Sequence, residues 1–312
     1  MKNLNAVFSK LNVRRRYEVW FLRLGLADDS GAWWFRYLLM NPGRRGCAGN
    51  PSGMPVQVWA TWFPQGGKPS SFIQGFGLDQ LQLSAPRSSP FHFGIGDNRI
   101  DEDSCRGRIE VDGHRIAWNL QYRSNAHVTL SDKGWIGFSR TPHSDALFSG
   151  EIDFDGTQFR GEPLAWGLQG HNCGYRHRNQ WTWTHACIPQ PDGSASSFEA
   201  LTYEMPLGLR FRKAVLWHRG RWYMFGKFRE QVRDPKTLRW ILTCSDSSGN
   251  EVEIDIEGTG ASLHRLPYLK TDCSGTFEVA NNSLSAARIV LRANGTTEEL
   301  ITKNGAVLEM AG

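Results

Sequence analysis

The segment HNCGYRHRNQWTWTHAC, residues 171–187, carries the clearest strand pattern of the chain. In its second half, bulky and small side chains alternate with the two-residue period of a β-strand. The bulky face has Trp181, Trp183, His185 and Cys187. Val, Ile or Leu would fill an ordinary core more readily, whereas indole and imidazole suit a pocket that holds a lipophilic ligand. Two interpretations stay open: the wall of a ligand pocket, or a Trp-rich core strand whose His donates to a backbone carbonyl.

Short alternating runs and tight turns continue on both sides of this segment. Asp112-Gly113 and Asp155-Gly156 separate such runs and are typical of hairpins. The 312 residues include 13 Trp and 33 Gly, a composition that favours broad-faced strands joined by turns over a helical bundle. Residues 4–11 could form a short helix or an arm, but no long helix is expected. The predicted fold is all-β and antiparallel, with two packed barrels or sandwiches.

Residues 189–197, PQPDGSASS, have the most linker-like composition in the chain. Placing the boundary there gives two domains of ordinary size. We therefore predict an N-terminal domain over residues 1–188, a linker over 189–197 and a C-terminal domain over 198–312. A long hairpin loop is the alternative for this segment.

Charge and terminal sequence argue against several classes of protein. The net charge of +5 is spread thinly, and its one basic run, Arg14-Arg15-Arg16, leads directly into an apolar strand, so nucleic-acid binding is not expected. No secretory signal pattern and no membrane-spanning apolar stretch is present in the sequence. The six cysteines are scattered, which favours free thiols in a reducing cytoplasm over a disulfide framework.

Common catalytic and cofactor motifs are also weak. His and Cys gather in residues 171–187, but structural zinc sites usually take ligands from short knuckles on turns, so no metal site is predicted. A nucleophile elbow is missing, and a Cys173–His185 pair across a hairpin is unspecific. The glycines of residues 75–77 and 94–96 lack the strand–turn–helix context of a dinucleotide loop, so no cofactor is predicted.

After metal, nucleophilic and cofactor chemistry, the remaining candidate is acid–base catalysis inside an aromatic cavity. Glu18 shares a predicted strand face with Trp20, and burial would raise the pKa of its carboxyl and leave it protonated near neutral pH. Nearby aromatic faces could then stabilise a developing cation. The alternative for Glu18 is an ion pair with a strand arginine such as Arg23 or Arg36.

Several of these motifs resemble those of one protein family. Asn172-Cys173-Gly174 followed by Trp181-Thr182-Trp183 is similar to the Asn-Trp-Gly and Trp-x-Trp hallmark of tocopherol-cyclase-like proteins. The wider group includes carotenoid 1,2-hydratases and lipocalin-type Diels–Alderases. Further similarities lie in residues 17–23, in 105–109 with 116–120, and in 266–268 with 275–278. Two positions depart from the pattern: Cys173 replaces a Trp and Asn119 replaces an Asp.

The resemblance implies two tandem lipocalin-like β domains that bind a lipophilic, often isoprenoid or polyketide, molecule. It also implies cyclisation, hydration or pericyclic closure without a cofactor. We therefore expect a cyclase, isomerase or hydratase, with a non-catalytic carrier or sensor as the alternative and a structural role as a third. The expected catalytic residues are Glu18, His185 and His171. The expected substrate-binding residues are Trp20, Tyr37, Asn172, Arg176, Trp181, Trp183 and Tyr203.

Overall fold

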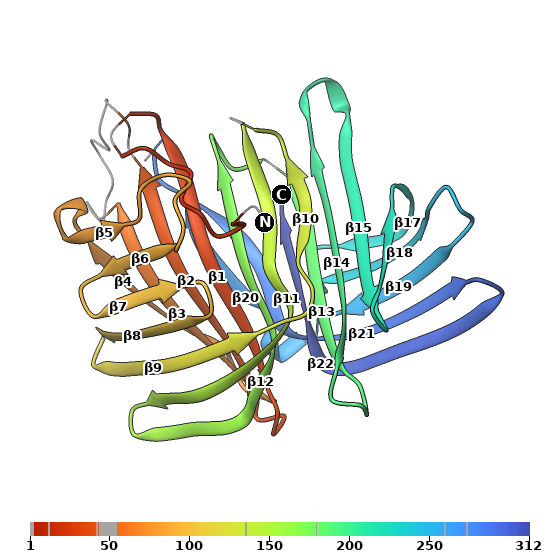
Figure 1. Cartoon of the computed structure of the whole chain (residues 1–312), viewed down its shortest axis with the longest axis horizontal. Coiled ribbons are helices and arrows are strands. Elements are labelled where there is room, and N and C mark those ends of the chain that lie inside the picture. Colours follow the sequence, from red (N-terminus) through yellow and green to blue (C-terminus); the bar gives the residue numbers. More distant parts are fainter. Residues whose placement is uncertain are drawn as a thin grey trace.

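The computed structural model describes residues 3–11, 13–41, 43, 55–134, 136–178, 180–258, 260–272 and 274–312. These residues form two curled antiparallel sheets that lie side by side (Figure 1). The predicted all-β antiparallel class is confirmed. The helical elements with described bounds are short 3₁₀ turns: η2 (Leu78–Gln80), η3 (Pro206–Gly208) and η4 (Gly260–Ser262). No helix among the described residues is long and apolar enough to cross a membrane.

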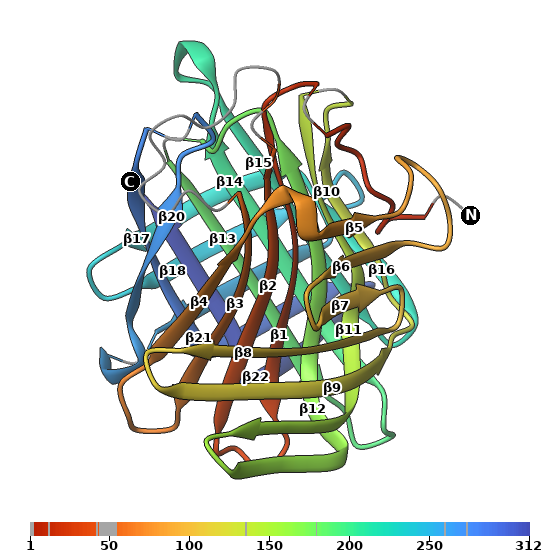
Figure 2. The same cartoon turned by 90° about the vertical axis from the view of Figure 1, so that its left-hand side faces the viewer.

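The first sheet has twelve strands in the order β4-β3-β2-β1-β12-β11-β9-β8-β7-β6-β5, with β10 paired to β11. Its strands are β1 (Arg16–Leu26), β2 (Gly31–Asn41), β3 (Val56–Pro64), β4 (Ser70–Phe76), β5 (Leu81–Leu83), β6 (His92–Ile95), β7 (Asn98–Asp101), β8 (Ser104–Val111), β9 (His114–Arg123), β10 (Val128–Asp132), β11 (Gly137–Phe154) and β12 (Thr157–Gly174). Figure 2 shows β8 and β9 crossing in front of β1–β4, so this sheet folds over on itself and encloses a core.

The second sheet has ten strands in the order β16-β15-β14-β13-β22-β21-β19-β18-β17, with β20 paired to β21. Its strands are β13 (Trp181–Pro189), β14 (Ala195–Glu204), β15 (Arg210–His218), β16 (Arg221–Phe225), β17 (Lys227–Asp234), β18 (Arg239–Ser245), β19 (Glu251–Glu257), β20 (His264–Leu269), β21 (Thr276–Ala293) and β22 (Thr296–Ala311).

The two sheets repeat one topology. In each, the first four strands form a meander of hairpins, and the last strand returns to pair with the first, β12 with β1 and β22 with β13. Each ends in its longest hairpin, β11–β12 and β21–β22, with strands of 16 to 18 residues. Register shifts interrupt both hairpins, and such bulges bend a strand and increase its twist. The long strands can therefore curl around a core.

Residues 189–197, expected as an interdomain linker, lie at a turn inside the second sheet. β13 ends at Pro189, β14 begins at Ala195, and the two strands pair directly. The chain passes from the first sheet to the second in the segment after Gly174 and before Trp181. The hairpin alternative therefore fits the strand pairing, and we propose a domain boundary near residues 175–180. The Pro, Gly and Ser composition of 189–197 reflects the turn chemistry that a tight reversal needs.

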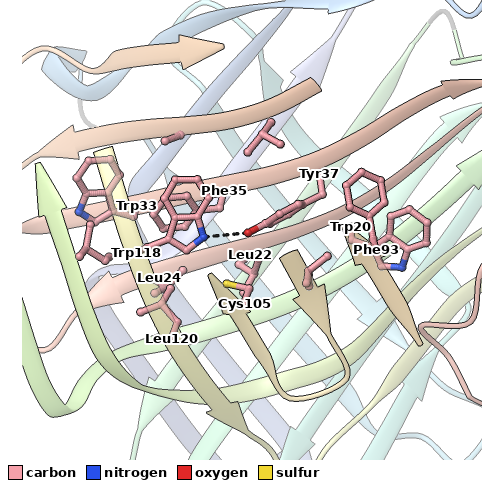
Figure 3. Close-up of a cluster of buried hydrophobic side chains, with 14 of the residues drawn as sticks. Trp20, Leu22, Leu24, Trp33, Phe35, Tyr37, Phe93, Cys105, Trp118 and Leu120 are labelled. Carbon is pink, nitrogen blue, oxygen red and sulfur yellow. Dashed lines mark hydrogen bonds between the residues drawn. The ribbon is translucent and has the colours of Figure 1, made fainter. Parts of the chain in front are cut away.

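Buried apolar side chains form three clusters: one inside each sheet, and one between the sheets. Figure 3 shows the first, in which the Trp118 Nε1–H donates to the Tyr37 hydroxyl at 2.9 Å amid stacked rings. The cluster between the sheets includes Phe21 and Trp34 from the first and Trp183 and Leu201 from the second. Both faces of β1 and β2 are covered. Side chains that alternate along these strands therefore pack into two different clusters.

Arg23 ties the two sheets together through hydrogen bonds. Its side chain is 1% exposed and donates to the carbonyl oxygens of Ser283, Asn304, Gly305 and Ala306. These acceptors lie in the bulged part of the β21–β22 hairpin. A bulge leaves carbonyl groups without ladder partners, and a guanidinium has enough donors to satisfy several of them.

Candidate functional site

A cavity of about 1050 Å³ lies between the two sheets, at the end where β1 and β13 begin and β12 and β22 finish. Pockets for drug-sized ligands are usually about 300–1,000 Å³. The lining residues are Val13, Arg14, Arg15, Arg16, Tyr17, Val19, Phe21, Trp34, Arg36, Gly43, Ser131, Lys133, Ile136, Gly137, Phe138, Ser139, Asn172, Cys173, Gly174, Tyr175, Arg176, His177, Arg178, Trp181, Trp183, Leu201, Tyr203, Tyr268 and Glu309.

Strand alternation decides which side chains reach this cavity. On β1 the odd-numbered Tyr17, Val19 and Phe21 line it, and the even-numbered side chains from Trp20 onward face the interior of the first sheet. On β13, Trp181 and Trp183 line it from the opposite side. Phe21 and Trp183 meet edge to face with ring centroids 5.8 Å apart. Aromatic side chains from both sheets therefore make the apolar walls.

One carboxyl group lies in the lining, on the last strand of the chain. Glu309 is 7% exposed and accepts hydrogen bonds from Trp181 Nε1 at 2.9 Å and from the Tyr268 hydroxyl at 2.8 Å. Burial raises the pKa of the Glu309 carboxyl, although the positive charge of Arg36 opposes that rise. Glu309 is thus a candidate proton donor inside an aromatic pocket.

Arg36 places a buried cation beside this acid. Its side chain is 5% exposed, and its guanidinium carbon lies 4.1 Å from the ring centroid of Tyr268 and 4.6 Å from that of Trp59. Aromatic faces attract a cation through their quadrupoles. The Nη1 atom of Arg36 is buried and has no hydrogen-bond partner among the described residues. A donor of this kind is available to a ligand.

A stacked imidazole completes the polar part of the cavity. The ring of His177 lies on that of Tyr17, with centroids 4.0 Å apart and planes 10° from parallel. Burial, and then the charge of Arg36, lowers the pKa of His177 to about 3, so its imidazole is neutral at neutral pH. Its buried Nδ1 has no partner in the described structure. A neutral imidazole of this kind can accept a hydrogen bond or a proton.

Positive charge gathers around the cavity. Among its described lining residues, seven are Arg or Lys and one is a carboxylic acid, Glu309: the cations are Arg14, Arg15, Arg16, Arg36, Lys133, Arg176 and Arg178. Arg14, Lys133 and Arg176 are exposed, so they mark the edge where the cavity meets solvent. Arg178 lies over the ring of Tyr203, 4.9 Å from its centroid.

Five of the residues expected to bind substrate line this cavity: Asn172, Arg176, Trp181, Trp183 and Tyr203. The Nε1–H of Trp183 donates to the buried Glu199 at 2.9 Å, and the Tyr203 ring stacks on Phe211 with centroids 4.6 Å apart. These contacts fix the orientation of two wall residues. Their contact with a substrate remains a proposal.

Glu18 and His171, expected as catalytic residues, lie on the opposite face of the sheet from the cavity. The Glu18 carboxylate accepts hydrogen bonds from the backbone N–H groups of Phe8 and Ser9 at 2.7 and 2.8 Å, and its Oε1 lies 3.0 Å from His171 Nε2. His171 also contacts the Leu4 carbonyl through Nδ1 at 2.8 Å. The pair therefore fastens the N-terminal arm, and neither residue is among those that line the cavity.

Trp20, Tyr37 and His185 are also placed away from the lining. Trp20 and Tyr37 belong to the core inside the first sheet (Figure 3), because they alternate with the cavity-facing residues of β1 and β2. His185 lies two residues beyond Trp183, where its Nε2 contacts the Ser144 carbonyl at 2.7 Å. Burial lowers the pKa of His185 to about 3, so this imidazole is neutral and unsuited to donate a proton.

No group of three or more His, Cys, Asp or Glu side chains suited to a metal ion occurs within the described ranges. The thiols of Cys105, Cys173, Cys187 and Cys244 are free and buried. Cys47 and Cys273 lie outside the described residues.

Comparison with solved structures identifies the architecture. Kievitone hydratase from Nectria haematococca superposes over 100% of this chain and 98% of its own, with a TM-score of 0.59 and 11% identity. CghA superposes over 98% and 93%, with a TM-score of 0.62 and 10% identity. The chain shares their fold. A putative AttH from Nitrosomonas europaea also matches, over 96% and 94%, with a TM-score of 0.53 and 12% identity.

The expected resemblance is thereby confirmed at the level of the fold, and one of these structural neighbours is a hydratase. No protein-family model and no curated protein sequence matches the chain. With identities of 10 to 12%, residue roles have to be argued from this chain itself.

Sequence reasoning missed Glu309, Tyr268 and His177 as a group. Glu309 stands alone in the apolar run VLEMA at residues 307–311, and a single carboxylate in such a run is a signal for a buried acid. Arg36 gives a similar signal of a buried charge. Its predicted strand has bulky side chains on both faces, so either face would bury the guanidinium. The clustering of these residues depends on contacts between the sheets, which the sequence pattern does not contain.

Proposed function

We propose that the protein is an enzyme that adds water to, or closes a ring in, a lipophilic small molecule held between its two sheets. The supporting observation is that two titratable groups of one aromatic cavity have pKa values shifted in opposite directions. The pKa of the Glu309 carboxyl is raised, and that of the His177 imidazole is lowered. Environments that separate two pKa values in this way assign an acid and a base.

In the proposed reaction, Glu309 gives its proton to an alkene or a carbonyl group of the substrate. The rings of Trp34, Trp181 and Trp183 face the developing positive charge and stabilise it. In a hydration, water adds to the cation and its surplus proton passes to His177, from which it returns to Glu309 through solvent. In a ring closure, a second part of the same substrate replaces the water. These steps need no group beyond the side chains named.

The same geometry assigns positioning roles. Trp181 Nε1 and the Tyr268 hydroxyl hold both oxygens of Glu309, which fixes the acid while the substrate binds. Asn172, Arg176 and Tyr203 are proposed to contact the substrate because they line the cavity. Glu18 and His171 are left out of this assignment because they contact the N-terminal arm. His185 is left out because it is not among the residues that line the cavity.

A panel of alkene-bearing lipophilic compounds, such as prenylated phenols and linear polyenes, tests the proposal. Each compound is incubated with the protein in heavy-oxygen water and followed by mass spectrometry. Hydration adds the mass of one labelled water, whereas ring closure changes retention without changing mass. Glu309→Gln should abolish the conversion, and Glu299→Gln, an exposed substitution on the same strand, should leave it intact.

The carrier alternative makes a different prediction. If the protein is a carrier, wild type and Glu309→Gln should both bind members of the panel tightly, and neither should convert them. That result would overturn the enzymatic proposal and retain the cavity as a binding site.

A further inference from the structure

Two hydrogen-bond donors on the cavity face of β2 have no partner in the described structure. They are the Nη1 atom of Arg36 and the Nε1 atom of Trp34, both buried, and both residues line the cavity. Buried donors without partners are rare in folded proteins because they lose their hydrogen bonds to water. Two such donors side by side indicate a ligand that supplies acceptor oxygens at this place.

The charge of Arg36 specifies the kind of acceptor. Two aromatic rings lie against its guanidinium, whose carbon is 4.1 Å from the Tyr268 centroid and 4.6 Å from the Trp59 centroid. Such ring contacts leave the N–H donors of the guanidinium in need of hydrogen-bond acceptors, and Nη1 has none among the described residues. Glu309, the carboxyl group of the lining, already accepts from Trp181 and Tyr268. A buried guanidinium is best satisfied by an anionic oxygen.

The edge of the cavity carries charge of the same sign. Arg14, Arg176 and Lys133 are exposed there. Two described acids next to these cations are engaged: Asp132 pairs with Arg140 at 2.7 Å, and Asp272 accepts hydrogen bonds from Ser274 while it also interacts with Arg15. An edge with surplus positive charge attracts anions from solution, and this attraction weakens as salt is added.

We infer that the molecule bound in this cavity is a lipophilic anion whose acidic group, a carboxylate or an ionised enol, is held by Arg36 and Trp34. This inference rests on the proposed function, because it names the substrate class of the same site. The apolar part of the molecule lies against the walls made by Phe21, Trp181 and Trp183. The basic edge draws the anion in, and Arg36 holds it.

Two fluorescent probes of nearly the same shape test the inference. 8-Anilinonaphthalene-1-sulfonate carries a negative charge, and N-phenyl-1-naphthylamine has the same ring system without it. Titration at low salt should give an affinity for the anionic probe that is at least about tenfold higher, as expected for hydrogen bonds to a charged partner. Added salt should reduce the affinity for the anionic probe and leave that for the neutral probe unchanged.

Variants identify the residues that cause the preference for the anionic probe. Arg36→Met should remove most of the preference for the anion while the neutral probe still binds. The double variant Arg176→Gln/Arg178→Gln, which combines an exposed and a half-buried cation of the lining, should lower the affinity for the anionic probe a few-fold and flatten its salt dependence. Lys227→Gln, an exposed cation on β17 away from the cavity, should change neither. If Arg36→Met fails to fold, the double variant and Arg36→Lys replace it in the test. Arg36→Lys keeps the positive charge but lacks the paired N–H donors of a guanidinium.

The outcomes separate this inference from the proposed function. Equal affinities for the two probes, with both lost in Trp183→Ala, would overturn the anion inference and keep the cavity as a lipophilic site. Binding of both probes that is unaffected by Trp183→Ala would place them outside the cavity and would overturn both. A preference for the anion that disappears in Lys227→Gln would show surface binding and would also overturn the inference.

Discussion

Glu199 should make the stability of this protein fall as the pH rises from about 4.5 to 7. Its carboxyl is 1% exposed, accepts hydrogen bonds from Trp183 Nε1 and from the Thr141 hydroxyl, and lies between the two sheets. Burial raises its pKa from 4.5 to about 7, although the two hydrogen bonds oppose the rise. The substitution Glu199→Gln keeps the shape of the side chain and removes its ionisation.

The magnitude follows from proton linkage. Above pH 4.5 the unfolded chain has lost this proton, whereas the folded protein keeps it until about pH 7. The folded state therefore binds more protons in this window, and the free energy of unfolding falls with rising pH. A pKa difference of about 2.5, at about 1.4 kcal/mol for each pH unit, amounts to a loss of about 3 kcal/mol. The loss is complete above pH 7 and absent below 4.5.

Urea unfolding followed by tryptophan fluorescence, at several pH values from 4.5 to 8, measures this effect. His185 faces Glu199 in the β13–β14 register and titrates with the opposite sign, since its pKa is lowered to about 3. It is present in both proteins, so the difference between wild type and Glu199→Gln isolates Glu199. As the pH rises across this range, the free energy of unfolding of Glu199→Gln should increase by about 3 kcal/mol relative to that of wild type. Parallel pH profiles would show that Glu199 is ionised in the folded protein and would refute the reasoning.

Three further substitutions have expected outcomes. Trp183→Ala should lower the free energy of unfolding by about 3–5 kcal/mol and weaken probe binding, because it removes a cavity wall and the donor to Glu199; urea and fluorescence titrations measure both. Arg23→Met should cost about 3–5 kcal/mol in the same urea assay, because it leaves buried carbonyls of the β21–β22 hairpin without donors; a change below 1 kcal/mol would contradict its role. Glu18→Gln should speed hydrogen exchange of the N-terminal arm, residues 3–11, and leave probe binding unchanged, because its carboxylate holds the arm and His171 on the far side of β1; lost probe binding would argue against this separation.

The strand pattern predicted much of the cavity wall and little of its chemistry. The alternation of residues 181–187 placed Trp181 and Trp183 on one face of β13, and both of these side chains line the cavity. On β1 the alternation grouped Glu18 with Trp20 correctly, but both faces of that strand are buried and rich in aromatic side chains. Local periodicity cannot decide which of two buried faces is the cavity. Only the position of the second sheet settles that choice.

Long-range pairing explains the remaining differences. Arg36 and Glu309 are neighbours because β2 and β22 belong to sheets that pack together, and no spacing in the sequence relates the two residues. Residues 189–197 have the composition that linkers and hairpin turns share, so composition alone left both readings open. The pairing of β13 with β14 supplies the missing information.

The doubled topology has an evolutionary consequence. The strands of each half pair only with strands of the same half, so the contacts across the seam between the halves are made by side chains, Arg23 among them. Substitutions along such a junction can reshape the hollow, or exchange one reactive group for another, without disturbing strand register. A scaffold of this kind allows new chemistry to arise by changing a few facing residues, and it offers the same freedom to anyone who redesigns it.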